Sequence, residues 1–350
     1  KGISVEQHYH NRRRQQNEEN MPSVKTVQAG LDFLKEHAQM ENWFLQIECF
    51  DPHEPFYVPD SYRRLYGLPK EETLFWPRYG EIDSSQYKGD IELSKKEYAA
   101  LLTMCDAQLG KVLDFMDDHH MWEDTLLMVN TDHGFLLGEH GYFGKNFPPL
   151  HDELVHLPFF IHVPGQKEGS ATKQLGATVD VMPTLLDYFG CDLDQMGEMD
   201  GCSLRAVLEN DQPIHEMLLF GVHGAYTCCA DGKFVYMKAN SVSGNQPIYE
   251  YTWMPTNMRG FFNRTQLEQA EIVTGSRFTN GIPCVRIPAN LPYFHADHYG
   301  DRLYDVQNDP EENENLLNCD NQKQWNRKLQ KTMEKTGAPE EEYRRLGLIN

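Results

Sequence analysis

The stretch Thr125–Lys145 reads TLLMVNTDHGFLLGEHGYFGK and places a short apolar run directly before a polar cluster. The run, Leu126–Asn130, has the length and composition of a strand buried on both faces. In an open parallel sheet, ligands bind beyond the carboxyl ends of the strands, which is where Asp132 and His133 fall. A carboxylate and an imidazole both bind metals, and Gly134 lets the backbone turn sharply beside them. The stretch therefore predicts one half of a metal site at a strand end.

The length and composition indicate a globular protein. The chain has 350 residues and a mass of 40.6 kDa, enough for one large domain and a smaller one. Hydrophobic residues make up 40% of the sequence. No apolar run approaches the roughly 18 residues that would span a bilayer, so we expect no membrane span.

The chain is acidic, with 32 Lys and Arg residues against 53 Asp and Glu residues and a formal net charge of -21. This balance disfavours binding to a phosphate backbone, and we expect no nucleic-acid partner. It also repels a small anionic substrate, which would need a local cation at its site.

The eight cysteines form no CxxC pair and no regular spacing, which argues against a zinc ribbon and against a disulfide framework. Unpatterned cysteines are typical of a reducing compartment and slightly favour the cytoplasm. The sequence begins at Lys1 with no initiator Met, so a secreted or periplasmic location stays an alternative.

Hydrophobic spacing and capping residues predict helices and strands throughout the first 210 residues. The expected elements are a helix from Ser23, a strand at Trp43–Cys49, a helix capped by Ser94, strands at Leu126–Asn130 and Leu157–Val163, and a helix that Asp180 caps and Gly190 closes. This order predicts a mainly parallel sheet flanked by helices.

A proline-bounded loop, FDPHEPF at residues 50–56, follows the expected strand at Trp43–Cys49. Its two prolines exclude a helix and fix the backbone on either side of His53 and Glu54. A rigid loop is suited to present the His53 imidazole to a pocket. The alternative is a histidine that only fills a turn.

The pattern changes after residue 210, where short strands and tight turns replace the longer elements. Strands are expected at Met217–Val222, Ala225–Cys229 and Lys233–Lys238, which together predict an antiparallel meander, and a charged helical end is expected from Asp320. We therefore expect two domains, a large α/β domain at 1–210 and a smaller α+β domain with an antiparallel sheet at 211–350.

Several motifs follow one another in an order that is far more specific than any one of them. They are DPHEPF at 51–56, DHGFLLGEHGYFGK at 132–145, VDVMPTLL at 179–186, RLYDV at 302–306 and NDPEENENL at 308–316. In this order the chain resembles the sulfatase family of the alkaline-phosphatase-like superfamily. The resemblance implies an alkaline-phosphatase-like α/β fold and the hydrolysis of a sulfate ester.

The resemblance also implies roles for four residues. Asp132 and His133 match two metal ligands of the family. Lys145 matches the lysine that contacts the sulfate and steadies the leaving oxygen, and His53 matches the loop histidine that reaches the same leaving group. The motifs around Tyr304 match a C-terminal signature that is structural.

Two further residues are candidate substrate contacts. His140 lies between the metal motif and Lys145, and Arg259 lies in an aromatic-rich segment near residues 250–262. The expected partner is an anionic small-molecule or saccharide sulfate ester. We expect one divalent metal ion, Ca²⁺ first, with Mn²⁺ or Zn²⁺ as alternatives because the imidazole of His133 suits softer ions.

The nucleophile of the family is absent from the sequence. The resemblance predicts a Cys or Ser in the pattern Cys/Ser-x-Pro/Ala-x-Arg, matured to formylglycine, and no Cys or Ser here fits it; Cys202–Arg205 and Ser61–Arg64 come nearest. We expect the nucleophile on an N-terminal segment of the same protein that precedes these residues, which would then be a partner of this chain.

Two other functions stay open at the level of sequence. A phosphonate monoester or phosphodiester hydrolase of the same superfamily would share the Asp-His-Gly motif, the histidine loop and the lysine. A non-catalytic binding protein on the same fold would account for the missing nucleophile.

Overall fold

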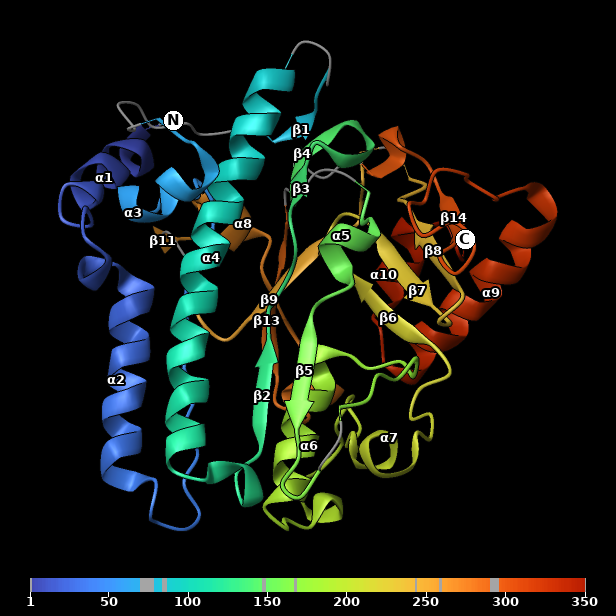
Figure 1. Cartoon of the computed structure of the whole chain (residues 1–350). Coiled ribbons are helices and arrows are strands. Elements are labelled where there is room, and N and C mark those ends of the chain that lie inside the picture. Colours follow the sequence, from blue (N-terminus) through green and yellow to red (C-terminus); the bar gives the residue numbers. More distant parts are fainter. Residues whose placement is uncertain are drawn as a thin grey trace. The chain divides into compact units, whose positions relative to one another are not determined.

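The computed structural model describes residues 2–69, 79–83, 87–146, 149–166, 169–242, 244–257, 260–289 and 296–349. Arg259, one of the predicted substrate contacts, lies outside these residues. The chain forms two compact units, Lys1–Lys145 with His156–Gly169, and Asn146–Val155 with Ser170–Asn350 (Figure 1). The domain division at residue 211 stays a prediction.

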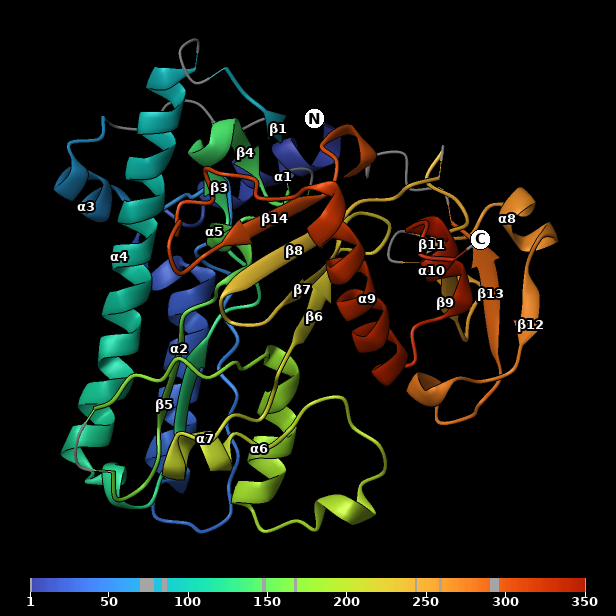
Figure 2. The same ribbon diagram turned by 90° about the vertical axis from the view of Figure 1, so that its right-hand side faces the viewer.

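The first unit is built around two long helices that lie side by side (Figures 1 and 2). They are α2 (Pro22–His37) and α4 (Lys88–Asp118), and Val27 and Leu31 of α2 pack against Val112 of α4. The helix expected to begin at Ser94 begins six residues earlier. The reason is local, because the buried Ser94 hydroxyl donates to the Asp90 carbonyl at 2.8 Å instead of capping a helix.

Shorter helices complete the first unit. They are α1 (Gly2–Arg12), α3 (Asp60–Arg63) and the 3₁₀ turns η1 (Glu18–Asn20), η2 (Arg64–Tyr66), η3 (Met121–Glu123) and η4 (Glu139–Gly141).

Strand β2 (Leu127–Asn130) confirms the strand expected before Asp132, but it is half-buried rather than covered on both faces. It pairs antiparallel with β5 (Phe159–His162), with Leu127 opposite His162. The excursion between them returns the chain in the opposite direction. All strand pairs among the described residues are antiparallel, so the mainly parallel pairing that the sequence predicted does not appear in them.

The prediction of a strand at Trp43–Cys49 is wrong. These residues join no strand in the described part of the chain, and Phe44 is 58% exposed. An apolar run becomes a strand only where a neighbouring backbone supplies its hydrogen bonds, and the described residues offer it none.

A small sheet and one core cluster hold the loop and the hairpin that carry the predicted site. The sheet has the order β1 (Gly80–Glu81), β4 (Tyr142–Gly144), β3 (Leu136–Leu137). Phe56 of the histidine loop, 1% exposed, shares a buried cluster with Leu137 of β3, Phe143 of β4 and Leu101 of α4. The 50–56 loop and the β3–β4 hairpin are therefore fixed by the same packing.

The second unit contains a four-stranded antiparallel sheet that confirms the predicted meander. Its order is β14 (Arg302–Asp305), β8 (Phe234–Lys238), β7 (Thr227–Ala230), β6 (Leu218–Gly221). Helix α9 (Cys319–Lys335) packs on this sheet through Trp325, Leu329 and Met333 (Figure 2). The short α10 (Glu340–Arg345) follows and adds Tyr343 to the same core.

The remaining elements of the second unit are short. A second sheet has the order β12 (Glu271–Val273), β13 (Cys284–Pro288), β9 (Tyr249–Thr252), and β10 (Thr256–Asn257) pairs with β11 (Gly260–Phe261). The helical pieces are α5 (Asp152–Val155), η5 (Thr178–Asp180), α6 (Val181–Tyr188), η6 (Leu193–Gln195), α7 (Arg205–Asn210), α8 (Arg264–Glu268), η7 (Arg277–Thr279) and η8 (Ala296–His298). Among the described residues, no helix has the length and apolar character needed to cross a bilayer.

Candidate active site

The imidazole of His53 is held by its own loop. Its Nδ1 lies 2.6 Å from the Glu54 carbonyl oxygen, and its ring stacks on Phe50 with the ring centroids 4.3 Å apart. Because a carbonyl oxygen only accepts, the bond places the proton on Nδ1, and the lone pair of a neutral ring is then on Nε2. The side chain is 29% exposed, so Nε2 is fixed but accessible.

Lys145 lies far from His53 in the sequence but beside it in the first unit. The residue follows β4 directly, its side chain is 12% exposed, and its Nζ lies 2.9 Å from His53 Nε2. With the proton on Nδ1, the lysine ammonium donates to the imidazole nitrogen. The two residues predicted to act on the leaving group are therefore brought together.

Glu54 is a third member of this group that sequence reasoning passed over. Its carboxylate is 5% exposed, accepts from Lys145 Nζ at 3.4 Å and lies 3.2 Å from His53 Nδ1. The Tyr79 hydroxyl donates to its other oxygen. A buried carboxylate needs such partners, and here it offsets the positive charge of the lysine. The sequence signal that could have pointed to Glu54 was Pro55, which follows it and fixes the loop.

The loop is also tied to α2 by a polar contact. The Ser23 hydroxyl donates to an Asp51 carboxylate oxygen at 2.5 Å. Burial raises the pKa of Asp51, with the Ser23 bond and His53 opposing it. The pKa of His8 is lowered, first by burial and then by the charges of Arg12 and His53. The charge of His53 therefore acts on the pKa values of both Asp51 and His8.

Asp132 and His133 lie directly after β2, at the strand end where they were predicted. His133 Nδ1 lies 2.9 Å from the Gly134 carbonyl oxygen, which assigns the proton to Nδ1 and the lone pair to Nε2. Nε2 in turn lies 3.5 Å from Asp132 Oδ2. Two electron-pair donors this close, with the Asp132 side chain 84% exposed and the His133 side chain 43% exposed, fit a shared cation.

His140 does not join the His53 group. It lies in η4 with a left-handed backbone (φ 55°), and among the described residues the side-chain partners of Lys145 are His53 and Glu54. Its predicted contact with substrate stays a prediction.

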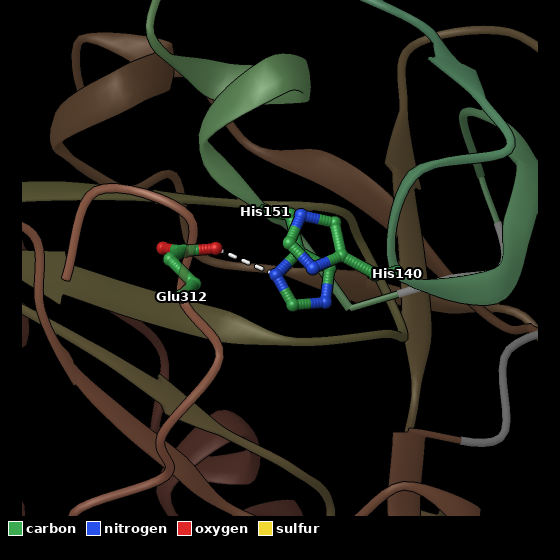
Figure 3. Close-up of side chains that lie close together, drawn as sticks. All are labelled: His140, His151 and Glu312. Atoms are coloured by element: carbon green, nitrogen blue, oxygen red, sulfur yellow. Dashed lines mark hydrogen bonds and ion pairs between the residues drawn. The ribbon is translucent and has the colours of Figure 1, made fainter.

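A second histidine after the motif, His151, has a partner in the C-terminal signature. His151 and Glu312 belong to the second unit and are both buried, and His151 Nδ1 lies 2.6 Å from Glu312 Oε2 (Figure 3). The Asp152 backbone N–H donates to the same oxygen at 3.3 Å. The pair fastens the segment that follows Lys145 to the loop after β14, which gives that signature motif a structural role.

The profile of the Sulfatase family matches residues 1–191. An arylsulfatase of Clostridium perfringens is 25% identical over 279 residues, which cover 72% of this chain and 56% of that protein. An N-acetylglucosamine-6-O-sulfatase of Bacteroides thetaiotaomicron is 28% identical over 196 residues, 51% of this chain and 34% of that protein. The matched part of the chain thus spans about half the length of the arylsulfatase and about a third of the length of the second relative.

Solved structures agree with the predicted fold class. The protein yidJ of Bacteroides fragilis aligns with a TM-score of 0.61 at 17% identity, over 91% of this chain and 59% of that one. A phosphonate monoester hydrolase of Silicibacter pomeroyi aligns with a TM-score of 0.53 at 20% identity, over 64% of this chain and 52% of that one. These likenesses confirm the alkaline-phosphatase-like α/β fold. Because the family profile covers more than half of the 350 residues, the chain belongs to the sulfatase family.

Proposed function

We propose that the protein hydrolyses sulfate esters and that Lys145 and His53 act on the bridging oxygen of the ester. The observation that carries this proposal is the contact of 2.9 Å between Lys145 Nζ and His53 Nε2. It concentrates donors in a chain whose net charge of -21 would otherwise repel an anion.

The chemistry of the reaction explains the need for both groups. When the sulfur–oxygen bond breaks, negative charge develops on the departing oxygen and on the sulfate oxygens. The ammonium of Lys145 stabilises this charge as a point cation. The departing oxygen takes its proton from the Lys145 ammonium, or from Nε2 of His53 when the ring is protonated, and Glu54 keeps both side chains in position.

Members of this family generally depend on a metal ion, and we propose that Asp132 and His133 would hold it. The ion would supply electrophilic stabilisation of the sulfate oxygens. We propose Ca²⁺, with Mn²⁺ or Zn²⁺ as alternatives that the imidazole ligand favours.

We further propose that the nucleophile, a formylglycine made from Cys or Ser, lies on an N-terminal segment of the same protein outside these 350 residues. Two observations support this. No Cys or Ser in the sequence has the required neighbours, and the chain covers 56% of the arylsulfatase it matches. The metal pair at the end of β2 is exposed, which leaves room for further ligands from that segment.

The proposed substrate class is a sulfated carbohydrate. It is supported by the match to a relative named as an N-acetylglucosamine-6-O-sulfatase. A sugar sulfate has an alkoxide leaving group, which needs the donors of Lys145 and His53 more than a phenolate does.

The test is a comparison of two substrates with one leaving group, 4-nitrophenyl sulfate and 4-nitrophenyl phenylphosphonate, on the protein with its N-terminal segment. Each is assayed after metal removal and again with added Ca²⁺, Mn²⁺ or Zn²⁺. We expect the higher kcat/KM for the sulfate. A higher kcat/KM for the phosphonate would replace the proposal with a phosphonate monoester hydrolase.

A further inference from the structure

Helix α9 carries a concentration of positive charge in an otherwise acidic chain. Among its seventeen residues, CDNQKQWNRKLQKTMEK, five are Lys or Arg and two are Asp or Glu, whereas the whole chain has a net charge of -21. Three of the cations, Lys323, Arg327 and Lys331, are spaced four residues apart and are all exposed. We call these three residues the α9 stripe.

The stripe occupies the face of α9 that does not pack on the sheet. Trp325, Leu329 and Met333 point into the core of the second unit and are at most 5% exposed. Residues four apart lie above one another on a helix, separated by about 6 Å along its axis. The stripe is therefore a row of three cations with regular spacing.

No counter-ion within the described residues neutralises this row. Neither an ion pair nor a side-chain hydrogen bond joins Lys323, Arg327 or Lys331 to another residue that the structure describes. Lys328, on the adjacent face, differs: its Nζ lies 3.0 Å from Asp231 and 3.9 Å from the centre of the Trp325 ring. Like charges four residues apart weaken a helix, and a bound anion would relieve that repulsion.

The face of α9 that carries the stripe is open to a ligand. A shallow, open space of about 480 Å³ on this face is lined by the three stripe residues together with Asp320, Gln324 and Lys328. Four of the six lining side chains are cationic, one is an amide and one is a carboxylate. Its lining suits a ligand that offers several anionic and hydroxyl oxygens along its length.

We propose that the α9 stripe binds a sulfated polysaccharide chain. The proposal rests on the proposed sulfate-ester function and extends it from one ester to a polymer that carries several. Regularly spaced cations match an anionic group that recurs along a chain, and each contact adds to the others because the sulfates are linked.

The same surface does not suit a nucleic acid. Single-stranded nucleic acids are held by bases stacked on exposed aromatic rings as well as by cations. The aromatic residue of α9, Trp325, is 5% exposed and packs inward. The rest of the acidic chain would also repel the dense charge of a duplex.

The experiment measures binding of the protein with its N-terminal segment to immobilised dextran sulfate over a series of NaCl concentrations, with uncharged dextran and single-stranded DNA as parallel probes. The test variant is K323Q/R327Q/K331Q, which keeps helix-forming side chains and removes three charges. The control variant is K25Q/K88Q/K96Q, which removes three charges from exposed lysines on α2 and α4. Circular dichroism of each variant establishes that it is folded.

We expect wild-type binding to dextran sulfate that weakens as salt rises, at least a tenfold loss in K323Q/R327Q/K331Q, and less than a twofold loss in K25Q/K88Q/K96Q. Equal losses in the two variants, or single-stranded DNA that binds as tightly as dextran sulfate, would overturn the proposal.

Turnover of 4-nitrophenyl sulfate by the same variant in the protein with its N-terminal segment separates this proposal from the proposed function. Unchanged turnover with lost dextran sulfate binding supports both. If the protein binds dextran sulfate through the stripe but does not hydrolyse sulfate esters, the proposed function is overturned and the proposed binding surface stands.

Discussion

Lys145 Nζ lies 2.9 Å from His53 Nε2, although the two residues are 92 positions apart in the sequence. The contact is made possible by a shared core in which Phe56 of one loop and Phe143 of one hairpin pack together. It turns two separate candidates into a single group, with the Glu54 carboxylate beside both side chains.

Replacing Lys145 by alanine is expected to lower the turnover of sulfate esters at least tenfold, because the departing oxygen loses a charged donor. KM should change less than kcat, since the charge develops mainly in the transition state. Steady-state kinetics with 4-nitrophenyl sulfate measures both. Lys35→Ala, which removes an exposed lysine paired with Asp32, is the control. Unaltered turnover in Lys145→Ala would favour a non-catalytic binding protein.

Replacing Glu54 by glutamine is expected to reduce kcat about tenfold and the free energy of unfolding by about 2 kcal/mol. The amide keeps the size of the side chain but leaves the Lys145 ammonium without its buried counter-ion. Kinetics and urea unfolding of the same preparation separate the two effects. If stability falls while kcat stays at the wild-type value, Glu54 has no positioning role.

Substituting His133 by alanine is expected to raise the metal concentration needed for half-maximal activity by about tenfold or more, because one of the two described ligands is lost. Metal titration of the chelator-treated protein gives this value directly. His119→Ala removes an exposed imidazole that stacks on Phe115 of α4 and provides the control. The same metal requirement in both variants would place the metal elsewhere.

The stability of α10 should depend on pH through Glu342. Its carboxylate accepts from the Arg345 guanidinium at 2.5 and 2.8 Å and from the Thr227 hydroxyl at 2.7 Å. Burial alone would raise the pKa of Glu342, but Arg345 and Thr227 outweigh it and hold the pKa below its ordinary value. A depressed pKa stabilises the fold above the unfolded value, and that contribution is lost as the pH falls through the folded value.

Glu342→Gln is therefore expected to cost about 3 kcal/mol at pH 7, because Arg345 is buried and would lose its charged partner. The difference from wild type should shrink as the pH falls below the unfolded pKa and through the lowered folded pKa, where the carboxylate becomes protonated. Urea unfolding at pH 7 and pH 3.5 measures it. Glu340→Gln, which breaks an exposed pair with Arg344 on the same helix, should cost less than about 0.5 kcal/mol. A Glu342→Gln difference that stays constant with pH would contradict the account.

Local sequence patterns predicted the elements that local forces determine. The α2 and α6 helices and the β6–β7–β8 meander follow from periodic apolar residues and turn signals. The helix start predicted at Ser94 was wrong because a serine inside a helix can donate to the carbonyl four residues before it. A serine therefore does not by itself mark the beginning of a helix.

What depends on distant parts of the chain could not be predicted in the same way. Whether Trp43–Cys49 forms a ladder depends on a neighbouring strand, which its own residues do not encode. Motif order identified His53 and Lys145 as candidates, but Glu54 emerged only when the lysine was found beside it. A carboxylate in a loop is unremarkable until its burial and its partners are known.

The dependence of the Lys145→Ala effect on the leaving group tests the central claim most directly. Wild type and variant are compared on a series of sulfate esters from 4-nitrophenyl sulfate, whose leaving group is stable as an anion, to a glucosamine 6-sulfate, whose leaving group is an alkoxide. If Lys145 and His53 stabilise the departing oxygen, the loss in kcat/KM should increase at least tenfold along the series. An equal loss for every ester would contradict the claim and assign Lys145 to ground-state binding of the sulfate.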